Sequence, residues 1–265
     1  MATDSNLPVL LSLDRGIARI RFNRPSALNA IDVAMAEHLL VAVKRLQAAG
    51  GARVVVLSGE GRAFMGGGDL RAFHDDIAHA PDTARAIIDP VNEALLLLAE
   101  GDAPVIASLH GAVAGGGMSL ALGADLAIAA DDVKLSMAYS RIGASIDCGG
   151  SWHLPRLVGQ RRAMEIALLS DPIDAPTALA LGLVNRVVAA ADREAETLAW
   201  AERLAQGPTH AFGRIRKLLR TSHRATLGEQ LRAERDAFVQ GAATPDFAEG
   251  LASFFAKRPP AFDGV

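Results

Sequence analysis

The chain of 265 residues is half hydrophobic and 22% charged, which is enough apolar surface to form one large core or two small ones. Its net charge of −3 excludes the strongly basic surface typical of nucleic-acid binding, and no apolar run approaches the roughly 18–20 residues that span a bilayer. The first six residues lack the character of a signal peptide, and a single cysteine excludes an internal disulfide framework. We therefore expect a soluble, cytoplasmic protein with neither nucleic acid nor membrane as a partner.

The first part of the chain predicts a β-hairpin followed by a helix and a strand. Residues 9–13 and 17–22 are apolar runs on either side of an Asp-Arg-Gly turn. Asp32 is placed to cap a helix whose apolar residues recur at helical spacing and which ends at Gly50. Residues 53–57 form a short apolar run, which is typical of a buried strand.

The next segment, residues 71–82, is rich in charge and contains His74, Asp75, Asp76 and His79. Two histidines and two aspartates raise the question of a metal site, but their spacing matches no zinc motif. We expect a solvated, mobile loop here rather than a metal site.

The remaining sequence alternates helical and strand patterns and then becomes helical. The expected helices are residues 83–100, 149–158 and 160–169, and the expected strands are residues 104–109, 125–130, 133–137 and 184–188. From residue 192 onward the pattern is helical, with breaks near residues 207, 226 and 243. We expect an α/β core of repeated strand-strand-helix units over residues 1–190 and a helical region over residues 191–265. Apolar side chains of that region either join subunits or pack back on the core.

Two glycine-rich turns, at residues 66–68 and 115–117, each lie between a strand pattern and a helix pattern. Glycines allow a ligand to approach the backbone closely, and the first N–H groups of a helix have no acceptor inside it. If the two turns converge, their N–H groups form an oxyanion hole; otherwise they are ordinary turns. Neither turn fits a nucleotide-binding loop, because no Gly-Lys-Ser/Thr follows and no acidic residue stands at the dinucleotide spacing.

A candidate base for such a site is Asp147, which stands among apolar and small residues before Gly149 and Gly150. A carboxylate there is partly desolvated and therefore a stronger base. The alternative is that Asp147 only caps the helix that follows, which is a common role for aspartate.

Several motifs in order along nearly the whole chain make it similar to the crotonase superfamily, the enoyl-CoA hydratase/isomerase family. They are residues 23–30, 63–70, 104–117, 125, 154–159, 180–184 and 249–259. The resemblance implies a crotonase-like spiral of ββα units with a C-terminal helical trimerisation region. It also implies a homotrimer or dimer of trimers and an acyl-CoA thioester as the ligand.

Carried over by position, the resemblance makes the N–H groups of Gly68 and Gly116 the oxyanion donors. Coenzyme A would then lie along the turn of Ala27 and Leu28, with its adenine facing Gly66. Asp69 and Leu70 belong to the same implied binding site. Arg71 is placed to meet a phosphate of coenzyme A, and Lys257 to reach the coenzyme A of a neighbouring subunit.

The departures from the family pattern bear on the reaction. Hydratases of this family use two glutamates, and their positions are taken here by Ser119 and Tyr139. Tyrosine is a poor base at neutral pH because its ordinary pKa is about 10, and Ser119 has no evident base near it in the sequence. Family members that move double bonds place an aspartate at the position of Asp147. Residues 137–152 are especially similar to ring-1,2-epoxyphenylacetyl-CoA isomerases.

Dehalogenases that act on 4-chlorobenzoyl-CoA also have this aspartate and an aromatic residue at position 139, so the resemblance makes Tyr139 a lining residue of the acyl pocket. We expect an acyl-CoA isomerase that uses Asp147 and needs no metal or redox cofactor, because coenzyme A is part of the substrate. Three alternatives stay open. They are a hydratase that uses Asp147 and water or Tyr139, a non-catalytic acyl-CoA-binding protein, and a serine hydrolase. The last needs a Ser-His-Asp arrangement, which Ser119 and His110 do not supply by themselves.

Overall fold

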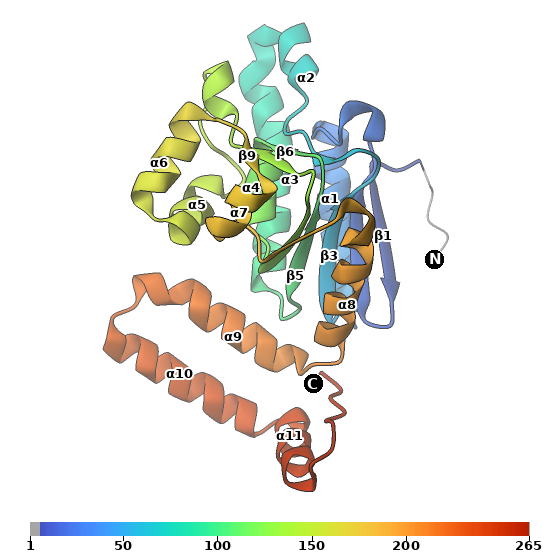
Figure 1. The fold of residues 1–265 in the computed structure, drawn as a ribbon, viewed down its shortest axis with the longest axis vertical. Helices are drawn as coiled ribbons and strands as arrows, with labels where there is room; N and C mark the ends of the chain where they lie inside the picture. The colour runs from blue at the N-terminus through green and yellow to red at the C-terminus, as the bar shows by residue number, and fades with distance from the viewer. Residues whose placement is uncertain (1–5, 265) are drawn as a thin grey trace.

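The computed structural model describes residues 6–264, and a six-stranded sheet lies at the centre of the fold (Figure 1). Its strand order is β1-β2-β3-β5-β7-β10. These strands are β1 (Val9–Asp14), β2 (Ile17–Phe22), β3 (Val54–Gly59), β5 (Val105–Leu109), β7 (Leu126–Ala130) and β10 (Arg186–Val188). Only β1 and β2 pair antiparallel; the other neighbours are parallel. The central strands are continuous apolar runs because helices cover both faces of the sheet.

A smaller sheet turns the fold into a spiral. Its order is β4-β6-β8-β9, with β4 (Ala63–Met65), β6 (Ala112–Ala114), β8 (Lys134–Ser136) and β9 (Ile173–Asp174). Each of β3, β5 and β7 is followed directly by a strand of this second sheet and then by a helical segment. This alternation confirms the predicted spiral of ββα units.

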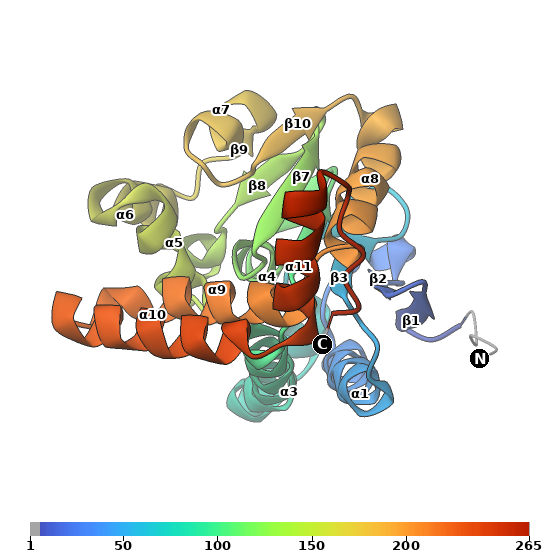
Figure 2. The ribbon, with the colours of Figure 1, turned by 90° about the horizontal axis from the view of Figure 1, so that it is seen from below.

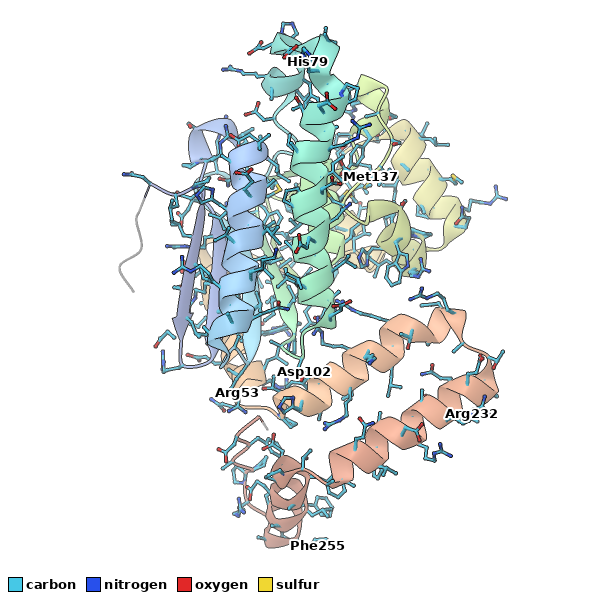
Figure 3. All side chains as sticks on the ribbon, turned by 180° about the vertical axis from the view of Figure 1, so that it is seen from behind. Arg53, His79, Asp102, Met137, Arg232 and Phe255 are labelled. Carbon is cyan, nitrogen blue, oxygen red and sulfur yellow. The ribbon has the colours of Figure 1, made fainter. Side chains whose placement is uncertain are left out.

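Long helices cover the two faces of the large sheet. On one face, α1 (Val33–Ala49) and α3 (Ala80–Glu100) lie side by side, as Figure 3 shows from behind. On the other face, α8 (Arg193–Ala205) buries Ala201 and Ala205 against Ile17, Val54 and Val56. The apolar residues of both faces are the core of the molecule.

Short helices come after individual strands of the second sheet along the chain. The last three helices of the protein lie away from the core. The short ones are α4 (Gly116–Leu122), α5 (Gly150–Val158), α6 (Gln160–Leu169) and α7 (Ala175–Ala180). Below the sheet in Figure 1 lie α9 (Thr209–Thr221), α10 (Leu227–Ala242) and α11 (Pro245–Ala256), and Figure 2 shows them from below. The predicted boundary at residue 190 falls at the start of the 3-10 helix Ala190–Asp192, just before α8 returns to the sheet.

Most predicted elements are confirmed. The hairpin is present, Asp32 caps α1 by accepting a hydrogen bond from the N–H of Met35 at 2.8 Å, and Gly50 ends that helix. The breaks between α8, α9, α10 and α11 occur where they were predicted. Within residues 6–264, no helix is long and apolar enough to cross a membrane.

Two predictions were wrong or incomplete. Residues 71–82 are not a loop: they belong to α2 (Leu70–Asp75), the 3-10 helix Ile77–His79 and the first turn of α3. Asp69 caps α2, and Pro81 fits the first turn of α3, where a missing N–H costs nothing. The strands β4, β6 and β9 were not predicted, because runs of two or three residues carry no periodicity.

Candidate active site

The turn containing Ala27 and Leu28 is fixed against the first glycine turn through Asn29. The fully buried side-chain amide of Asn29 donates hydrogen bonds to the backbone oxygens of Ala63 at 2.8 Å and Glu60 at 2.9 Å. Leu28 and Asn29 both have positive φ (53° and 56°), so the chain turns sharply here. The N–H of Gly66 donates to the oxygen of Leu28 at 2.8 Å. The structure therefore places the turn of Ala27 and Leu28 against Gly66.

The backbone at Gly68 is oriented by a parallel bridge to Ile31. The N–H of Ile31 donates to the oxygen of Gly67, and the N–H of Asp69 donates to the oxygen of Ile31, both at 2.8 Å. In this pattern the N–H and C=O of the intervening residue point away from the partner. The N–H of Gly68 therefore faces away from Ile31, and Gly68 is exposed.

The second glycine turn meets the first. A Cβ placed on Gly115 would lie 3.7 Å from the Cα of Gly67, and one on Gly67 would lie 3.1 Å from the oxygen of Ala114. Gly116 is the first residue of α4, so its N–H has no acceptor inside the helix. Among the residues that the structure describes, the N–H groups of Gly68 and Gly116 donate to no other backbone group.

Asp147 lies directly beside the second turn. A Cβ on Gly116 would lie 3.6 Å from Oδ1 of Asp147 and 3.8 Å from Sγ of Cys148. Asp147 does not cap α5: the capping residue is Gly149, and no side chain caps that end of the helix. The structure therefore contradicts the capping alternative and places the carboxylate next to one of the two predicted donors.

The carboxylate of Asp147 accepts a hydrogen bond from Tyr139, a contact that the sequence did not predict. The hydroxyl of Tyr139 donates a hydrogen bond to Oδ1 of Asp147, and it also lies 3.0 Å from the hydroxyl of Ser119. Ser119 is fully buried and Tyr139 is nearly so. The only signal in the sequence is that all three polar side chains stand in otherwise apolar or small-residue runs.

Burial keeps the neighbours of Asp147 protonated. Burial, followed by the negative charge of Asp147, raises the pKa of Tyr139 far above its usual value. The same two causes raise the pKa of the Cys148 thiol. Neutral hydroxyl and thiol groups therefore surround this carboxylate, and no second acid stands at position 119 or 139.

Within residues 6–264, no histidine is hydrogen-bonded to Ser119. Its hydrogen-bond partner is Tyr139, whereas Nε2 of His110 is bound to the oxygen of Gly61 at 2.9 Å. Burial lowers the pKa of His110, so that side chain is neutral. The geometry gives no support to a serine hydrolase.

The remaining predicted residues lie on the edge of this site or far from it. Asp69 accepts hydrogen bonds from Nη2 of Arg24 at 3.0 Å and from the N–H of Arg71 at 3.2 Å, so its carboxylate holds the first turn and α2 in place. Leu70 and Arg71 are exposed at the start of α2. Lys257 ends α11, at the opposite end of the molecule from α2 in Figure 1, so one chain alone does not bring it to the site.

Two other features lie outside this site. His74 pairs with Asp75 at 3.2 Å and His79 with Asp76 at 2.9 Å, all on the exposed surface.

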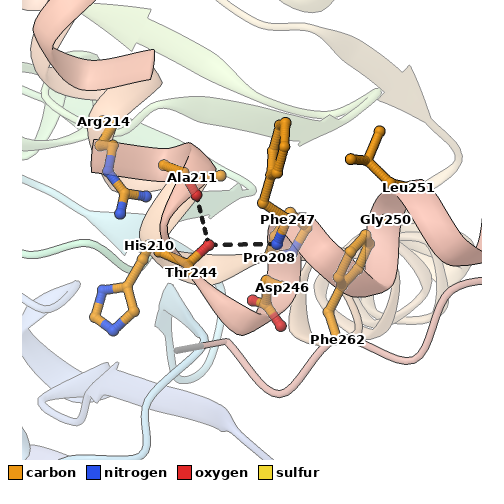
Figure 4. Close-up of a pocket in the computed structure, with 11 residues that line it drawn as sticks. Pro208, His210, Ala211, Arg214, Thr244, Asp246, Phe247, Gly250, Leu251 and Phe262 are labelled. Atoms are coloured by element: carbon orange, nitrogen blue, oxygen red, sulfur yellow. Dashed lines mark hydrogen bonds between the residues drawn. The ribbon is translucent and has the colours of Figure 1, made fainter. Parts of the chain in front are cut away.

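A cavity of about 270 Å³ between α9 and α11 is lined largely by apolar groups, among them Phe247 (Figure 4). None of the predicted site residues lines that cavity.

The structure is an α/β protein whose ββα units wind into a spiral. Within it two glycine turns face each other and carry backbone N–H groups that are able to donate hydrogen bonds. The family model described as enoyl-CoA hydratase/isomerase matches residues 12–265. A 1,2-epoxyphenylacetyl-CoA isomerase of Escherichia coli (strain K12) is 36% identical over 262 residues, covering 97% of this chain and 98% of that relative. A 4-chlorobenzoyl coenzyme A dehalogenase-2 of Arthrobacter sp is 32% identical over 259 residues, covering 97% and 94%.

A solved structure shows the same fold. The enoyl-CoA hydratase from Polaromonas sp. JS666 has a TM-score of 0.91 at 31% identity and covers 96% of this chain and 99% of its own. The chain belongs to the enoyl-CoA hydratase/isomerase family. Its relatives carry the names of an isomerase, a dehalogenase and a hydratase, so the family alone does not choose the reaction.

Proposed function

We propose that the protein is an acyl-CoA isomerase that moves a double bond, from a 3-enoyl- to a 2-enoyl-CoA or within a ring acyl-CoA. The thioester oxygen accepts hydrogen bonds from the N–H groups of Gly68 and Gly116. Asp147 takes a proton from the acyl group, and the negative charge moves to the thioester oxygen as a dienolate. The proton then returns from Asp147 to another carbon, so atoms and charge balance with one carboxylate.

One observation carries this proposal over a hydratase. The carboxylate of Asp147 lies beside Gly116, while the two positions where hydratases of the family need acids hold neutral, buried hydroxyls bonded to each other. Water addition needs groups that both activate water and protonate carbon, whereas a double-bond shift needs only one group that carries a proton.

The rest of the binding site follows from the same proposal. Coenzyme A lies along the turn of Ala27 and Leu28 and past Gly66, close to the backbone of Asp69 and to Leu70, and a phosphate meets Arg71. Lys257 reaches the coenzyme A of a neighbouring copy in a homotrimer or dimer of trimers. Neither a metal nor a redox cofactor takes part, because the enolate is stabilised by backbone N–H groups.

The test is a panel of acyl-CoA esters assayed with the wild-type protein. We expect the protein to isomerise a 3-enoyl-CoA. Hydration of crotonyl-CoA, monitored as the loss of enoyl absorbance, should be slower by about 100-fold or more, because the second acid is absent. Rapid hydration of crotonyl-CoA would make the protein a hydratase. Thermal stabilisation by CoA esters without turnover of any of them would make it a binding protein.

A further inference from the structure

We propose that Tyr139 is a positioning residue for the reaction, because its hydroxyl holds the carboxylate of Asp147 toward the oxyanion donors and is itself held by Ser119. This inference rests on the proposed function. It assigns Tyr139 more than the pocket-lining position that the resemblance implies.

The hydroxyl of Tyr139 is the centre of a short buried chain of polar groups. It donates to Oδ1 of Asp147, which lies 3.6 Å from the position of a Cβ on Gly116. On its other side the hydroxyl of Ser119 is 3.0 Å away. A hydrogen bond to an ionised group is stronger than one between neutral groups, so the phenol fixes the carboxylate in one orientation.

The backbone that carries Tyr139 is anchored independently of the hydrogen bonds between Ser119, Tyr139 and Asp147. The 3-10 helix Tyr139–Ile142 is tied to the end of α6, where Arg141 Nη2 donates to the oxygen of Ser170 at 2.6 Å. The hydroxyls of Ser140 and Ser170 lie 2.8 Å apart. Because the ring is mounted on a fixed segment, the position of its hydroxyl dictates the position of the carboxylate.

The two titratable neighbours of Asp147 keep their protons at neutral and mildly acidic pH, because burial and the negative charge of Asp147 raise the pKa of each. Among the described residues, the charged and titratable groups that influence the pKa of Tyr139 are Asp147 and Cys148, and the group that influences the pKa of Cys148 is Asp147. Both neighbours stay protonated. A hydrogen bond from Tyr139 favours the ionised carboxylate, which is the form that removes a proton.

The kinetic test compares Tyr139→Phe with the wild type. We expect kcat for a 3-enoyl-CoA to fall about 10- to 100-fold, as for the loss of a hydrogen bond to a charged group, while KM changes by less than about threefold. The acid limb of the kcat/KM profile should move to higher pH by about one unit, because the ionised base loses its donor. Ser119→Ala should produce a smaller effect of the same direction.

A matched control removes a buried hydroxyl elsewhere. Thr197 lies on α8, where its hydroxyl is 3.0 Å from that of Ser108, on the other side of the large sheet from α1 and α3. Thr197→Val should leave the pH profile unchanged even if it lowers the melting temperature. An unchanged kcat and pH profile in Tyr139→Phe, or the same pH shift in Thr197→Val, would overturn the proposal.

A second readout does not depend on activity. The chain has one tyrosine, so labelling the tyrosine ζ-carbon with ¹³C gives a single resonance that reports on Tyr139. This resonance should shift with pH over the range of the acid limb, and the shift should vanish in Asp147→Asn but persist in Ser119→Ala. A resonance that is indifferent to Asp147→Asn would overturn the inference. Absence of any isomerase activity in the wild type would instead overturn the proposed function, while the resonance still decides whether Tyr139 binds Asp147.

Discussion

Cys148 has a left-handed backbone conformation (φ 50°) between Asp147 and Gly149 (φ 78°). For a residue with a side chain this conformation costs about 1–2 kcal/mol, and the packed neighbours must hold it in place. The turn directs the carboxylate of Asp147 to Gly116 rather than to the N-terminus of α5. The left-handed turn at Cys148 thus accompanies a position of the Asp147 carboxylate beside Gly116 rather than at the start of α5.

Single residues also determine how closely the two glycine turns approach the rest of the fold. A Cβ on Gly117 would lie 2.5 Å from the oxygen of Met65, a distance that real Cβ atoms do not reach. Glycine at this position therefore lets α4 pack directly on β4, which carries the first turn. This close approach brings the second glycine turn against the first.

At the scale of elements, α9 is joined to the core through Asp125, directly before β7. Its carboxylate accepts hydrogen bonds from Nε of Arg216 at 2.7 Å, Nη2 of Arg220 at 2.8 Å and the N–H of Val105 at 2.8 Å. The side chains of Arg216 and Asp125 are 7% and 17% exposed. Removal of the carboxylate leaves a buried guanidinium without its counter-charge.

We therefore expect Asp125→Ala to lower the free energy of unfolding by about 3–5 kcal/mol, the usual cost of breaking a buried ion pair from one side. Urea denaturation measures this change. The control is Asp236→Ala, which removes an exposed pair with Arg235 and should change the free energy by less than about 0.5 kcal/mol. Equal losses in the two variants would contradict the role given to Asp125.

The elements also show what the sequence could predict. Long helices such as α1 and α8 were predictable because caps and apolar spacing are local. The helix α2 was missed because a short, charged, exposed segment has the composition of a loop. Among candidate site residues, local sequence singled out the two glycine turns and Asp147, and the family resemblance pointed to Gly68 and Gly116 within those turns. Neither predicted the hydrogen bond between Tyr139 and Asp147. It depends on how a 3-10 helix and the following loop fold over α4, which no spacing encodes.

At the scale of the whole molecule, the last three helices expose large apolar side chains away from the core. Phe238, Phe254 and Phe255 are 66%, 75% and 79% exposed, although each ring contacts another phenylalanine. Exposed apolar surface of this kind marks contact with another protein chain. A second copy of this chain is the partner we propose, since Lys257, which the family resemblance directs to a neighbouring subunit, stands directly after the ring-bearing helix α11.

We expect light scattering to give a mass of three or six times 27.7 kDa for the wild type. Replacing Phe254 and Phe255 together by serine should shift the mass toward the monomer, because it removes the apolar contact. Leu13→Ser, which changes an exposed apolar residue of β1, should leave the mass unchanged. A monomeric wild type would refute this assembly.

The most direct test of the central claim is the rate at which Asp147→Asn isomerises a 3-enoyl-CoA. Asparagine keeps the size of the side chain but cannot accept the proton, so the rate should fall by about 100-fold or more while binding of the CoA ester is largely retained. Such a result would place the proton transfer on Asp147, beside the N–H of Gly116. Undiminished turnover in this variant would contradict the account.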